Sequence, residues 1–396
     1  MISSPPSAQS GAAFDPAAYL PDDLLERVRE RAPIHDRDNT FPQQDLDELR
    51  DAGYLSVLVP AEQGGAGLGL AEVAILQQRL ATAAPATALA VNMHLVWTGV
   101  AKVFSDRGVP GLEFVQDGAV RGEVFAFGIS EGGNDLVLFG SDTSAVPTGD
   151  GGYAFTGTKI FTSLAPVWTK LGLHGLDTTS GDAPKLVFAF VERTDAVVTG
   201  DDWDTLGMRA TQSRTTRLNG AVADAAHVVR RINPGPNPDP IVFGIFSVFE
   251  ILLASVYTGI ARRAIDLAVQ TAQRRTSTRT GLAYSQDPDI RWRIADMALA
   301  YDALPPQIAA LARDVDSLAD NGPRWFTLLS GLKHRAITMA KHVVDEAMLA
   351  AGGGSYFSRN ELSRLYRDVL AGALHPSDPE SAHATAATAW LGPLDA

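Results

Sequence analysis

Apolar side chains recur at helical spacing through the first third of the chain. Four segments place apolar residues three or four positions apart: 21–32, 43–53, 70–84 and 86–104. This spacing is typical of helices that bury one face. A Gly-rich loop at 59–69 separates the second segment from the third. We therefore predict a helical domain over 16–122, preceded by a short disordered arm over 1–15.

The pattern of apolar and polar positions changes after residue 122. Four short runs are rich in β-branched and aromatic residues and are bounded by Gly, Asp or Ser: 123–130, 152–163, 184–193 and 213–222. Runs of this kind predict strands. We expect an antiparallel β-barrel or sandwich over 123–231, followed by a Pro- and Asn-rich linker at 232–240.

Helical periodicity returns over 241–396. Consecutive blocks of helix, strand and helix predict an α+β fold rather than alternating α/β units. The run 241–261 is long and apolar enough to be compared with a membrane span, but Glu250 lies at its centre. An acidic residue there costs roughly 2.5–3.5 kcal/mol in a bilayer. We therefore predict a buried core helix and no membrane partner.

Charge and composition exclude several classes of function. The formal net charge of -13 argues against binding to nucleic acid or anionic membranes. Because the chain has no cysteine, disulfides, thiolate chemistry and Cys-ligated metals are excluded. The eight histidines are scattered without a metal-binding spacing, so we expect no metal centre. The N-terminus lacks the features of a secretory signal, which predicts a cytoplasmic location.

Six local motifs are informative through their order and spacing. They are VPAEQGGAGLGLAE (59–72), FGISEGGND (127–135), GYAFTGTKIFTS (152–163), WDTLGMRATQS (203–213), TGIARRAIDLA (258–268) and AGGGSYFSRNELSRLYRDV (351–369). Together they resemble the acyl-CoA dehydrogenase family over nearly the whole chain. The resemblance implies a helical N-terminal domain, a middle antiparallel β-barrel and a C-terminal four-helix bundle. It also implies a flavin between barrel and bundle, and a homodimer or homotetramer.

The resemblance assigns five residues to the flavin. Ser130 and Thr162 match hydroxyl residues that contact the flavin ring. Arg275 matches an arginine that reaches the pyrophosphate across the subunit interface, and Gly352 and Gly353 match a glycine pair beside the adenosine. We expect FAD as the cofactor. FMN is the alternative, because several contacts of the family pattern to the ring and the adenosine are altered in this sequence.

Two residues depart from the family pattern at the flavin, and two others are candidates for contact with the substrate. Ile160 stands where the family has a tryptophan that stacks on the flavin, and Leu349 replaces a glutamine near the glycine pair. Arg209 lies in a segment that matches one packing beside the substrate and the barrel. His94 is a candidate second histidine of the active site, or a satisfied core histidine.

The catalytic base is the largest departure. Family dehydrogenases place a glutamate eight residues after the aspartate of an Arg-Asp pair, which here is Asp368. That eighth position is Pro376, and His375 precedes it. His375 could be a base, a protonated donor to the flavin, or an exposed helix-capping residue. Glu250 falls within one residue of a second base position known in the family, and could equally be the internal partner of an arginine.

Three functions follow from these patterns. The first is α,β-dehydrogenation of an acyl-CoA with hydride transfer to flavin N5, with Glu250 or His375 as base and an electron-transfer flavoprotein as acceptor. The second is oxygenation by reduced flavin supplied by a flavin reductase, because the Arg-Asp and His spacing also resembles flavin-dependent monooxygenases of this fold. The third is a non-catalytic relative that binds flavin or acyl-CoA. All three involve a small molecule and no nucleic acid.

Overall fold

The N-terminal domain is built of helices, as the periodicity predicts. The computed structural model describes residues 14–181 and 183–394, so the predicted arm 1–15 lies almost entirely outside the described residues. Within the described residues, five α-helices precede the first strand: α1 (Asp22–Asp38), α2 (Gln43–Asp51), α3 (Leu70–Ala83), α4 (Pro85–Asp106) and α5 (Glu113–Val120). Helix α4 is buried along almost its entire length, which places it at the centre of the molecule.

The middle domain is a sheet of eight strands. They are β1 (Phe125–Gly128), β2 (Ser144–Pro147), β3 (Tyr153–Thr162), β4 (Lys170–Asp177), β5 (Lys185–Glu192), β6 (Val197–Thr199), β7 (Arg214–Ala223) and β8 (Val228–Ile232). The pairing order is β6-β7-β3-β2-β4-β5-β8, and β1 pairs with β4. Strand β5 is buried on both faces except at its ends, whereas β3 and β7 alternate between buried and exposed positions.

The expected antiparallel character is incomplete. Strands β3, β5, β6, β7 and β8 pair antiparallel, but β4 pairs in parallel with β1 and at one position with β2. Among the described residues no pairing joins β6 to β8, so hydrogen bonds do not close the sheet into a barrel. Side-chain alternation marks a strand but does not specify its neighbour or direction, so the sequence did not reveal the parallel pairs.

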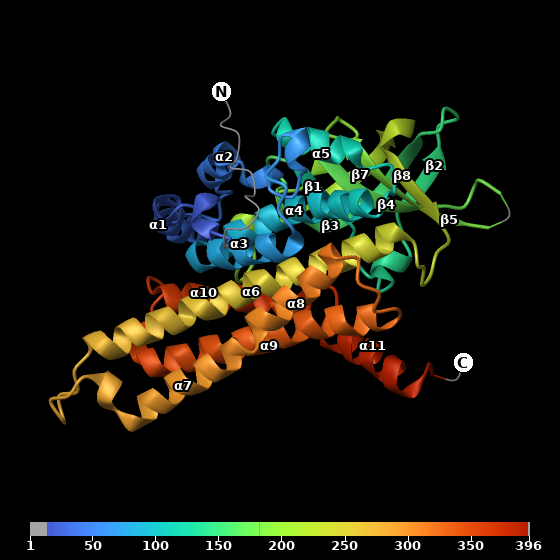
Figure 1. The fold of residues 1–396 in the computed structure, drawn as a ribbon. Coiled ribbons are helices and arrows are strands. Elements are labelled where there is room, and N and C mark those ends of the chain that lie inside the picture. Colours follow the sequence, from blue (N-terminus) through green and yellow to red (C-terminus); the bar gives the residue numbers. More distant parts are fainter. Residues whose placement is uncertain (1–13, 182, 395–396) are drawn as a thin grey trace.

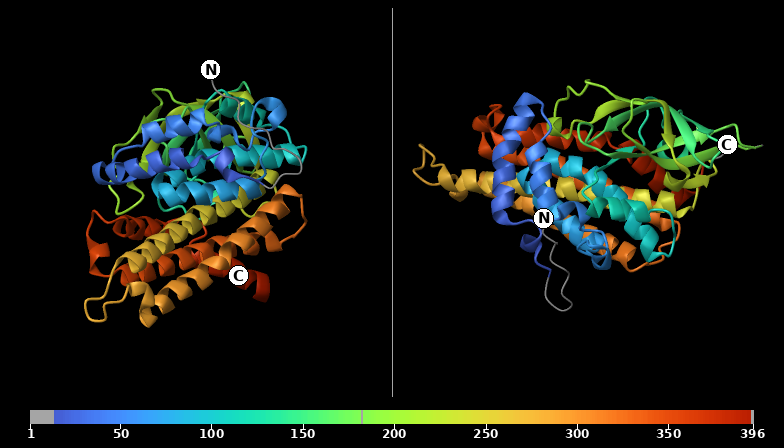
Figure 2. Two further views of the ribbon diagram at one scale, coloured as in Figure 1. Left: turned by 60° about the vertical axis from the view of Figure 1, so that its left-hand side comes forward. Right: turned by 90° about the horizontal axis from the view of Figure 1, so that it is seen from above.

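The C-terminal domain packs beneath the first two (Figure 1). Its helices are α6 (Pro240–Arg274), α7 (Pro288–Asp302), α8 (Leu304–Asp316), α9 (Arg324–Ala351), α10 (Glu361–Leu370) and α11 (Pro379–Leu391). Helices α7 and α8 follow one another with a single residue between them and pack with α6 and α9 as a bundle. Helix α10 lies against α6 and α9, and α11 extends from the end of the bundle near the sheet (Figures 1 and 2).

Helix α6 joins the three parts of the molecule. It runs between the N-terminal helices and the lower bundle, in contact with α3, α4 and α9 (Figure 1). It is long and apolar enough to cross a membrane, but 89% of its most apolar 18-residue window is buried inside the protein. The prediction of a core helix is therefore confirmed, and its single acidic residue in this stretch, Glu250, lies in the interior.

Candidate functional site

A cavity of about 160 Å³ lies where the sheet, α6 and the start of α11 meet. Three groups of residues line it: Phe127, Ile129, Ser130, Asp135, Leu136, Val137, Leu138 and Phe139 from β1 and the following loop; Ile245, Phe246, Phe249 and Glu250 from α6; Pro376, Ser377, Ser381 and Thr385 from the C-terminal segment. Its walls are mainly apolar. A wider, solvent-open groove of about 440 Å³ lies between α6 and α7, where Arg262 and Asp266 pair with each other.

Glu250 is the buried acid of this cavity. Its side chain is 1% exposed, and its Oε1 accepts a hydrogen bond from the Ser377 hydroxyl. Its Oε2 is buried and has no hydrogen-bond partner in the part of the chain that the structure describes. Burial raises the pKa of Glu250, while Ser377 and the positive charge of Lys333 act in the opposite direction. The carboxyl group is thus held through one oxygen, while the other oxygen lacks a partner among the described residues.

Lys333 of α9 fixes the segment that faces Glu250. Its Nζ donates to the backbone carbonyls of His375 and Ser377, both at 2.9 Å. Ser377 has the left-handed backbone conformation (φ 56°), which is unusual for a side-chain-bearing residue. Burial lowers the pKa of Lys333, and Glu250 opposes that effect. Lys333 and Ser377 were not singled out from the sequence, although a lone lysine on the apolar stripe of α9 is a detectable signal.

His375 points toward α6 rather than into the cavity. Its Nε2 lies 2.8 Å from the hydroxyl oxygen of Tyr257, a fully buried residue of α6. The helical run ends before it, because α10 stops at Leu370 and a short turn follows, as Pro376 predicts. Burial and the nearby Lys333 hold the pKa of His375 well below its usual range, so the alternative of a protonated donor is not favoured. Pro376 and Ser377, not His375, line the cavity.

Ser130 lies at the edge of the same cavity, and Thr162 is buried at the end of the strand that pairs with the Ser130 loop. The backbone N–H of Ile160 donates to the carbonyl of Ser130 at 2.9 Å, which joins the loop after β1 to the end of β3. Ser130 lines the cavity. The hydroxyl of Thr162 is buried without a hydrogen-bond partner among the described residues. A buried hydroxyl without a partner is costly and fits the polar edge of a bound ring. These residues therefore fit a flavin.

The exposed surface beside Thr162 is apolar. Phe161, the neighbour of Thr162 in β3, is 59% exposed, and its ring lies edge-on to that of Trp203 with centroids 6.2 Å apart. Exposed side chains of this size are covered favourably by a flat aromatic ligand or by another protein surface. Ile160, which replaces the expected stacking tryptophan, is partly buried within β3.

Arg275, Gly352 and Gly353 form a separate group at the far end of α6. The Nη1 of Arg275 donates to the carbonyl of Ala351 at 2.6 Å, and its guanidinium lies over the ring of Tyr284. Around Gly353 there is open space, whereas a side chain at Gly352 would meet Arg275. This group lies roughly 37 Å along the helix from Glu250, at 1.5 Å per residue. One chain therefore does not bring the two sets of predicted flavin residues together.

His94 and Arg209 form hydrogen bonds with backbone groups inside the protein. The Nε2 of His94 donates to the carbonyl of Leu55 at 2.8 Å, and its Nδ1 accepts from the N–H of Phe125 at 3.1 Å. Both ring nitrogens are thus used in the core. Burial lowers the pKa of His94 to about 4, so the ring is neutral at physiological pH. This matches the alternative of a satisfied core histidine and not a substrate contact.

The segment around Arg209 is docked onto α10. Arg209 donates to the carbonyls of Asp36 and Thr205, which uses its guanidinium for loop structure instead of the predicted substrate contact. The N–H of Met208 donates to the buried carboxylate of Asp368 at 2.6 Å. A Cβ atom on Gly207 would lie 2.2 Å from the carbonyl oxygen of Arg367, so glycine is required for this approach. Arg367 and Asp368 of α10 therefore join the C-terminal helices to the segment that precedes β7.

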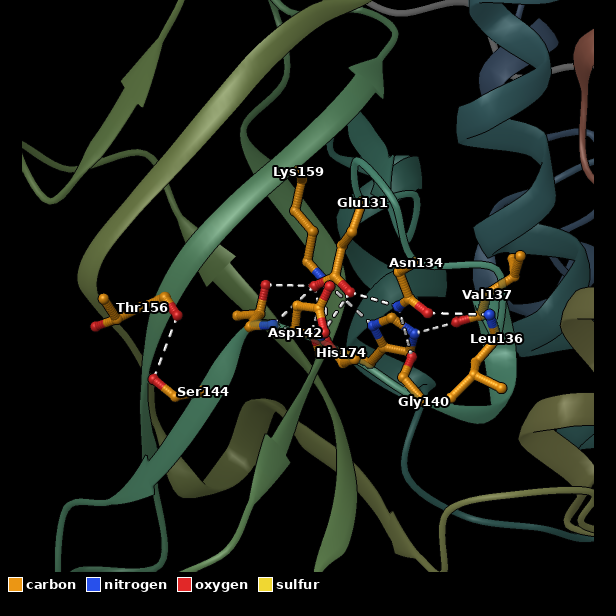
Figure 3. A network of polar contacts seen from close by, with 12 residues as sticks. Glu131, Asn134, Leu136, Val137, Gly140, Asp142, Ser144, Thr156, Lys159 and His174 are labelled. Carbon is orange, nitrogen blue, oxygen red and sulfur yellow. Dashed lines mark hydrogen bonds and ion pairs between the residues drawn. The ribbon is translucent and has the colours of Figure 1, made fainter.

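A buried network centred on Glu131 holds the wall of the cavity (Figure 3). Its Oε1 accepts from Lys159 Nζ at 2.7 Å, and its Oε2 accepts from Asn134 Nδ2 at 2.6 Å. Ser141, Thr143 and the N–H of Asp142 supply further donors. Burial alone would raise the pKa of Glu131, but Lys159 and these donors hold it far below its usual range. In the sequence, Glu131 stands out only as part of the motif at 127–135.

His174 connects this network to the loop that lines the cavity. Its Nδ1 lies 3.1 Å from Lys159 Nζ, and its Nε2 lies 2.7 Å from the carbonyl of Val137. Because the ammonium can only donate, Nδ1 is the acceptor and Nε2 carries the proton. Val137 has a left-handed backbone (φ 47°) and lines the cavity. The network thus fixes a strained loop beside the site (Figure 3).

Comparison with known proteins agrees with this architecture. Residues 23–105 match the acyl-CoA dehydrogenase N-terminal domain, and residues 251–377 match the acyl-CoA dehydrogenase C-terminal domain. The amino sugar nitrososynthase RubN8 of Streptomyces rubradiris is 29% identical over 358 residues, which cover 89% of this chain and 84% of that protein. Dibenzothiophene monooxygenase of Rhodococcus qingshengii is 27% identical over 381 residues, covering 90% and 88%.

Solved structures show the same fold. KijD3 in complex with FMN and dTDP-3-amino-2,3,6-trideoxy-4-keto-3-methyl-D-glucose superposes with a TM-score of 0.85 at 27% identity, over 98% of this chain and 96% of that one. Butyryl-CoA dehydrogenase of Megasphaera elsdenii has a TM-score of 0.83 at 19% identity over 97% and 100%, which shows the fold alone. Together with the matched domains, these similarities establish that the chain belongs to the acyl-CoA dehydrogenase family of flavoenzymes.

Proposed function

We propose that this protein is a flavin-dependent monooxygenase of a small molecule, and not an acyl-CoA dehydrogenase as first ranked from its sequence. The observation that carries the proposal is the segment after α10. It presents Pro376 and Ser377 to the cavity, while His375 is bonded to Tyr257 on α6. The base position of the family dehydrogenases is therefore occupied by a residue that cannot accept a proton.

The charge of the cavity also supports this proposal. Among its lining residues, two are ionisable, Asp135 and Glu250, and both are acidic. Acyl-CoA carries several phosphate charges, which acidic side chains repel. The cavity volume of about 160 Å³ suits a small substrate or one part of a larger one. Similarity to a nitrososynthase and to a dibenzothiophene monooxygenase points in the same direction.

Reduced flavin would supply two electrons and two protons, so that one oxygen atom of O₂ enters the substrate and the other leaves as water. Ser130 and Thr162 would hold the ring edge beside the cavity. The apolar side chains of Phe127 and Phe249 exclude water next to it, because their stacked rings, 5.5 Å apart, close that wall. A separate flavin reductase is the partner that this reaction requires.

FMN is the flavin that we propose. Arg275, expected to reach the pyrophosphate of FAD, instead donates to the carbonyl of Ala351. Leu349, which stands where the family has a glutamine beside the glycine pair, is 58% exposed. The KijD3 structure also contains FMN. FAD, our expectation from the sequence, needs these adenosine-side contacts and would depend on a second subunit of a homodimer or homotetramer.

Acyl-CoA dehydrogenation remains a second candidate because of one observation. Glu250 is a carboxyl group in the cavity with a free oxygen, and its pKa is raised by burial, as a base that removes an α-proton requires. An electron-transfer flavoprotein would then be the electron acceptor.

One pair of measurements separates the two functions. Flavin-loaded protein is titrated under nitrogen with a panel of acyl-CoA thioesters, while the visible flavin band is recorded. In parallel, oxygen uptake and product formation are measured with a flavin reductase and NADH. We expect no bleaching by any thioester and oxygen-dependent product from a small heteroatom-containing substrate. Bleaching that Glu250→Gln abolishes would establish the dehydrogenase instead.

A further inference from the structure

The second carboxylate oxygen of Glu250 requires a partner. Oε1 is satisfied by the Ser377 hydroxyl, but Oε2 is buried without a donor among the described residues. Leaving a buried carboxyl oxygen unpaired is unfavourable, and native proteins rarely do so unless a ligand or water completes the site. Glu250 also lines the cavity. These facts point to a hydrogen-bond donor on the substrate.

The surroundings of Glu250 restrict the chemistry of that donor. Among the residues that line the cavity, Asp135 is the other ionisable one, and it is exposed and acidic. No described lining residue carries a basic group, and the nearby Lys333, which does not line the cavity, donates its Nζ to the backbone carbonyls of His375 and Ser377. A cationic group is therefore attracted, whereas a carboxylate or phosphate is repelled.

The apolar walls of the cavity indicate the character of the rest of the substrate. Ile129, Leu138, Ile245 and Phe249 line the same cavity as Glu250 with aliphatic and aromatic surface. Apolar walls around one convergent polar group bind an apolar body and orient its single polar end. We therefore propose that the substrate is a small amine with an apolar body, whose nitrogen binds Oε2 of Glu250 and gives its proton to that oxygen. This inference rests on the proposed oxygenation and names its substrate class.

The proton transfer prepares the nitrogen for oxidation. In an ammonium group the lone pair is blocked, so the nitrogen cannot take up oxygen. One N–H bond of the ammonium breaks, an O–H bond forms on Oε2, and the electron pair of the broken bond stays on nitrogen. Because burial raises the pKa of Glu250, the transfer is closer to balanced than with an exposed carboxylate. Lys333 and Ser377 keep the acceptor in position.

The test uses binding to the full-length, flavin-free protein, so it does not depend on turnover. Three probes share a six-membered carbon ring: cyclohexylamine, cyclohexanol and cyclohexanecarboxylate. Dissociation constants are measured by titration calorimetry in two buffers of different ionisation enthalpy, which also counts the protons exchanged. We expect the amine to bind about tenfold or more tightly than the alcohol, and the carboxylate to bind most weakly, because charged hydrogen bonds are the strong ones. Equal binding of amine and alcohol, preference for the carboxylate, or no binding of the amine at millimolar concentration would overturn the proposal.

Variants connect the preference to Glu250. Glu250→Gln should reduce the affinity for cyclohexylamine about tenfold or more while changing that for cyclohexanol less than about twofold. Glu380→Gln is the matched control, because Glu380 is exposed on the first turn of α11 near the cavity and should change neither constant. An amine preference that survives in Glu250→Gln would overturn the assignment of the residue. Amine binding without oxygen-dependent product would contradict only the proposed oxygenation, so the two failures are distinguishable.

Discussion

The ring of His375 bonds the hydroxyl of Tyr257 across 2.8 Å, two turns of α6 away from Glu250. This pair gives His375 a role in holding the segment 375–377 against α6. We expect His375→Ala to lower the free energy of unfolding by about 1–2 kcal/mol through the lost hydrogen bond and packing. Its effect on turnover should be smaller than that of Glu250→Gln.

Chemical denaturation and steady-state kinetics on both variants check this expectation. Tyr257→Phe is the control, since it removes the hydroxyl and keeps the ring; it should cost about 1 kcal/mol. Suppose instead that His375→Ala abolished turnover without lowering the free energy of unfolding, and that Tyr257→Phe also left this free energy unchanged. His375 would then be a catalytic residue.

Ser377→Ala should move the pH dependence of catalysis. The Ser377 hydroxyl stabilises the charged form of Glu250, so its removal raises the pKa of that carboxyl group further. Glu250 must be ionised to accept a proton, and the acidic limb of kcat/KM against pH should therefore shift to higher pH. Ser381→Ala is the control: Ser381 lines the same cavity but bonds Asp378. An acidic limb that stays in place in Ser377→Ala would contradict this role.

The Glu131 network should be sensitive to the loss of one partner. Glu131→Gln leaves Lys159, fully buried, without its counter-ion, and breaking such a pair costs about 3–5 kcal/mol. The double variant Glu131→Gln with Lys159→Met should recover part of that loss, because it removes the unpaired charge. Urea denaturation of the single and double variants measures the coupling.

An exposed ion pair provides the comparison for this cycle. Asp38→Asn breaks the pair with Arg37, whose side chain is 70% exposed, and should change the free energy of unfolding far less than Glu131→Gln does, because solvent screens an exposed ion pair. A Glu131→Gln variant as stable as Asp38→Asn would show that the network does not hold the cavity wall.

His94 should make the protein less stable in mild acid. Its pKa is lowered from 6.5 to about 4 in the folded protein, so between these values the unfolded chain binds a proton that the folded one does not. Stability from this group is present above pH 6.5 and declines as the pH falls toward 4. The full effect on the free energy of unfolding is about 3 kcal/mol, because each unit of pKa shift corresponds to roughly 1.4 kcal/mol.

The free energy of unfolding between pH 4.5 and pH 7 tests the contribution of His94. His94→Gln can still donate to Leu55 and accept from Phe125 but does not titrate, so its curve should be flatter across this window. His174, whose pKa burial also lowers, remains in both proteins and cancels in the comparison. Parallel curves for the two proteins would contradict the prediction.

Much of the fold could be read from local patterns. The order of helical and strand blocks, and the core position of 241–261, follow from periodicities that each segment carries in its own residues. The parallel pairing of β1 with β4 could not be predicted, because alternation does not specify which strand lies alongside.

For the site, the sequence by itself determined that Glu250 would be an acid inside an apolar helix, and that Pro376 would end the helix before it and displace the family's base. Only the tertiary structure decided where the neighbouring side chains point. It turned His375 to Tyr257, and it brought Ser377 and Lys333, from separate elements, to Glu250. The physical reason is that the end of a helix at a proline depends only on neighbouring residues in the sequence. A hydrogen-bonded cluster depends instead on how α6, α9 and the C-terminal segment pack together.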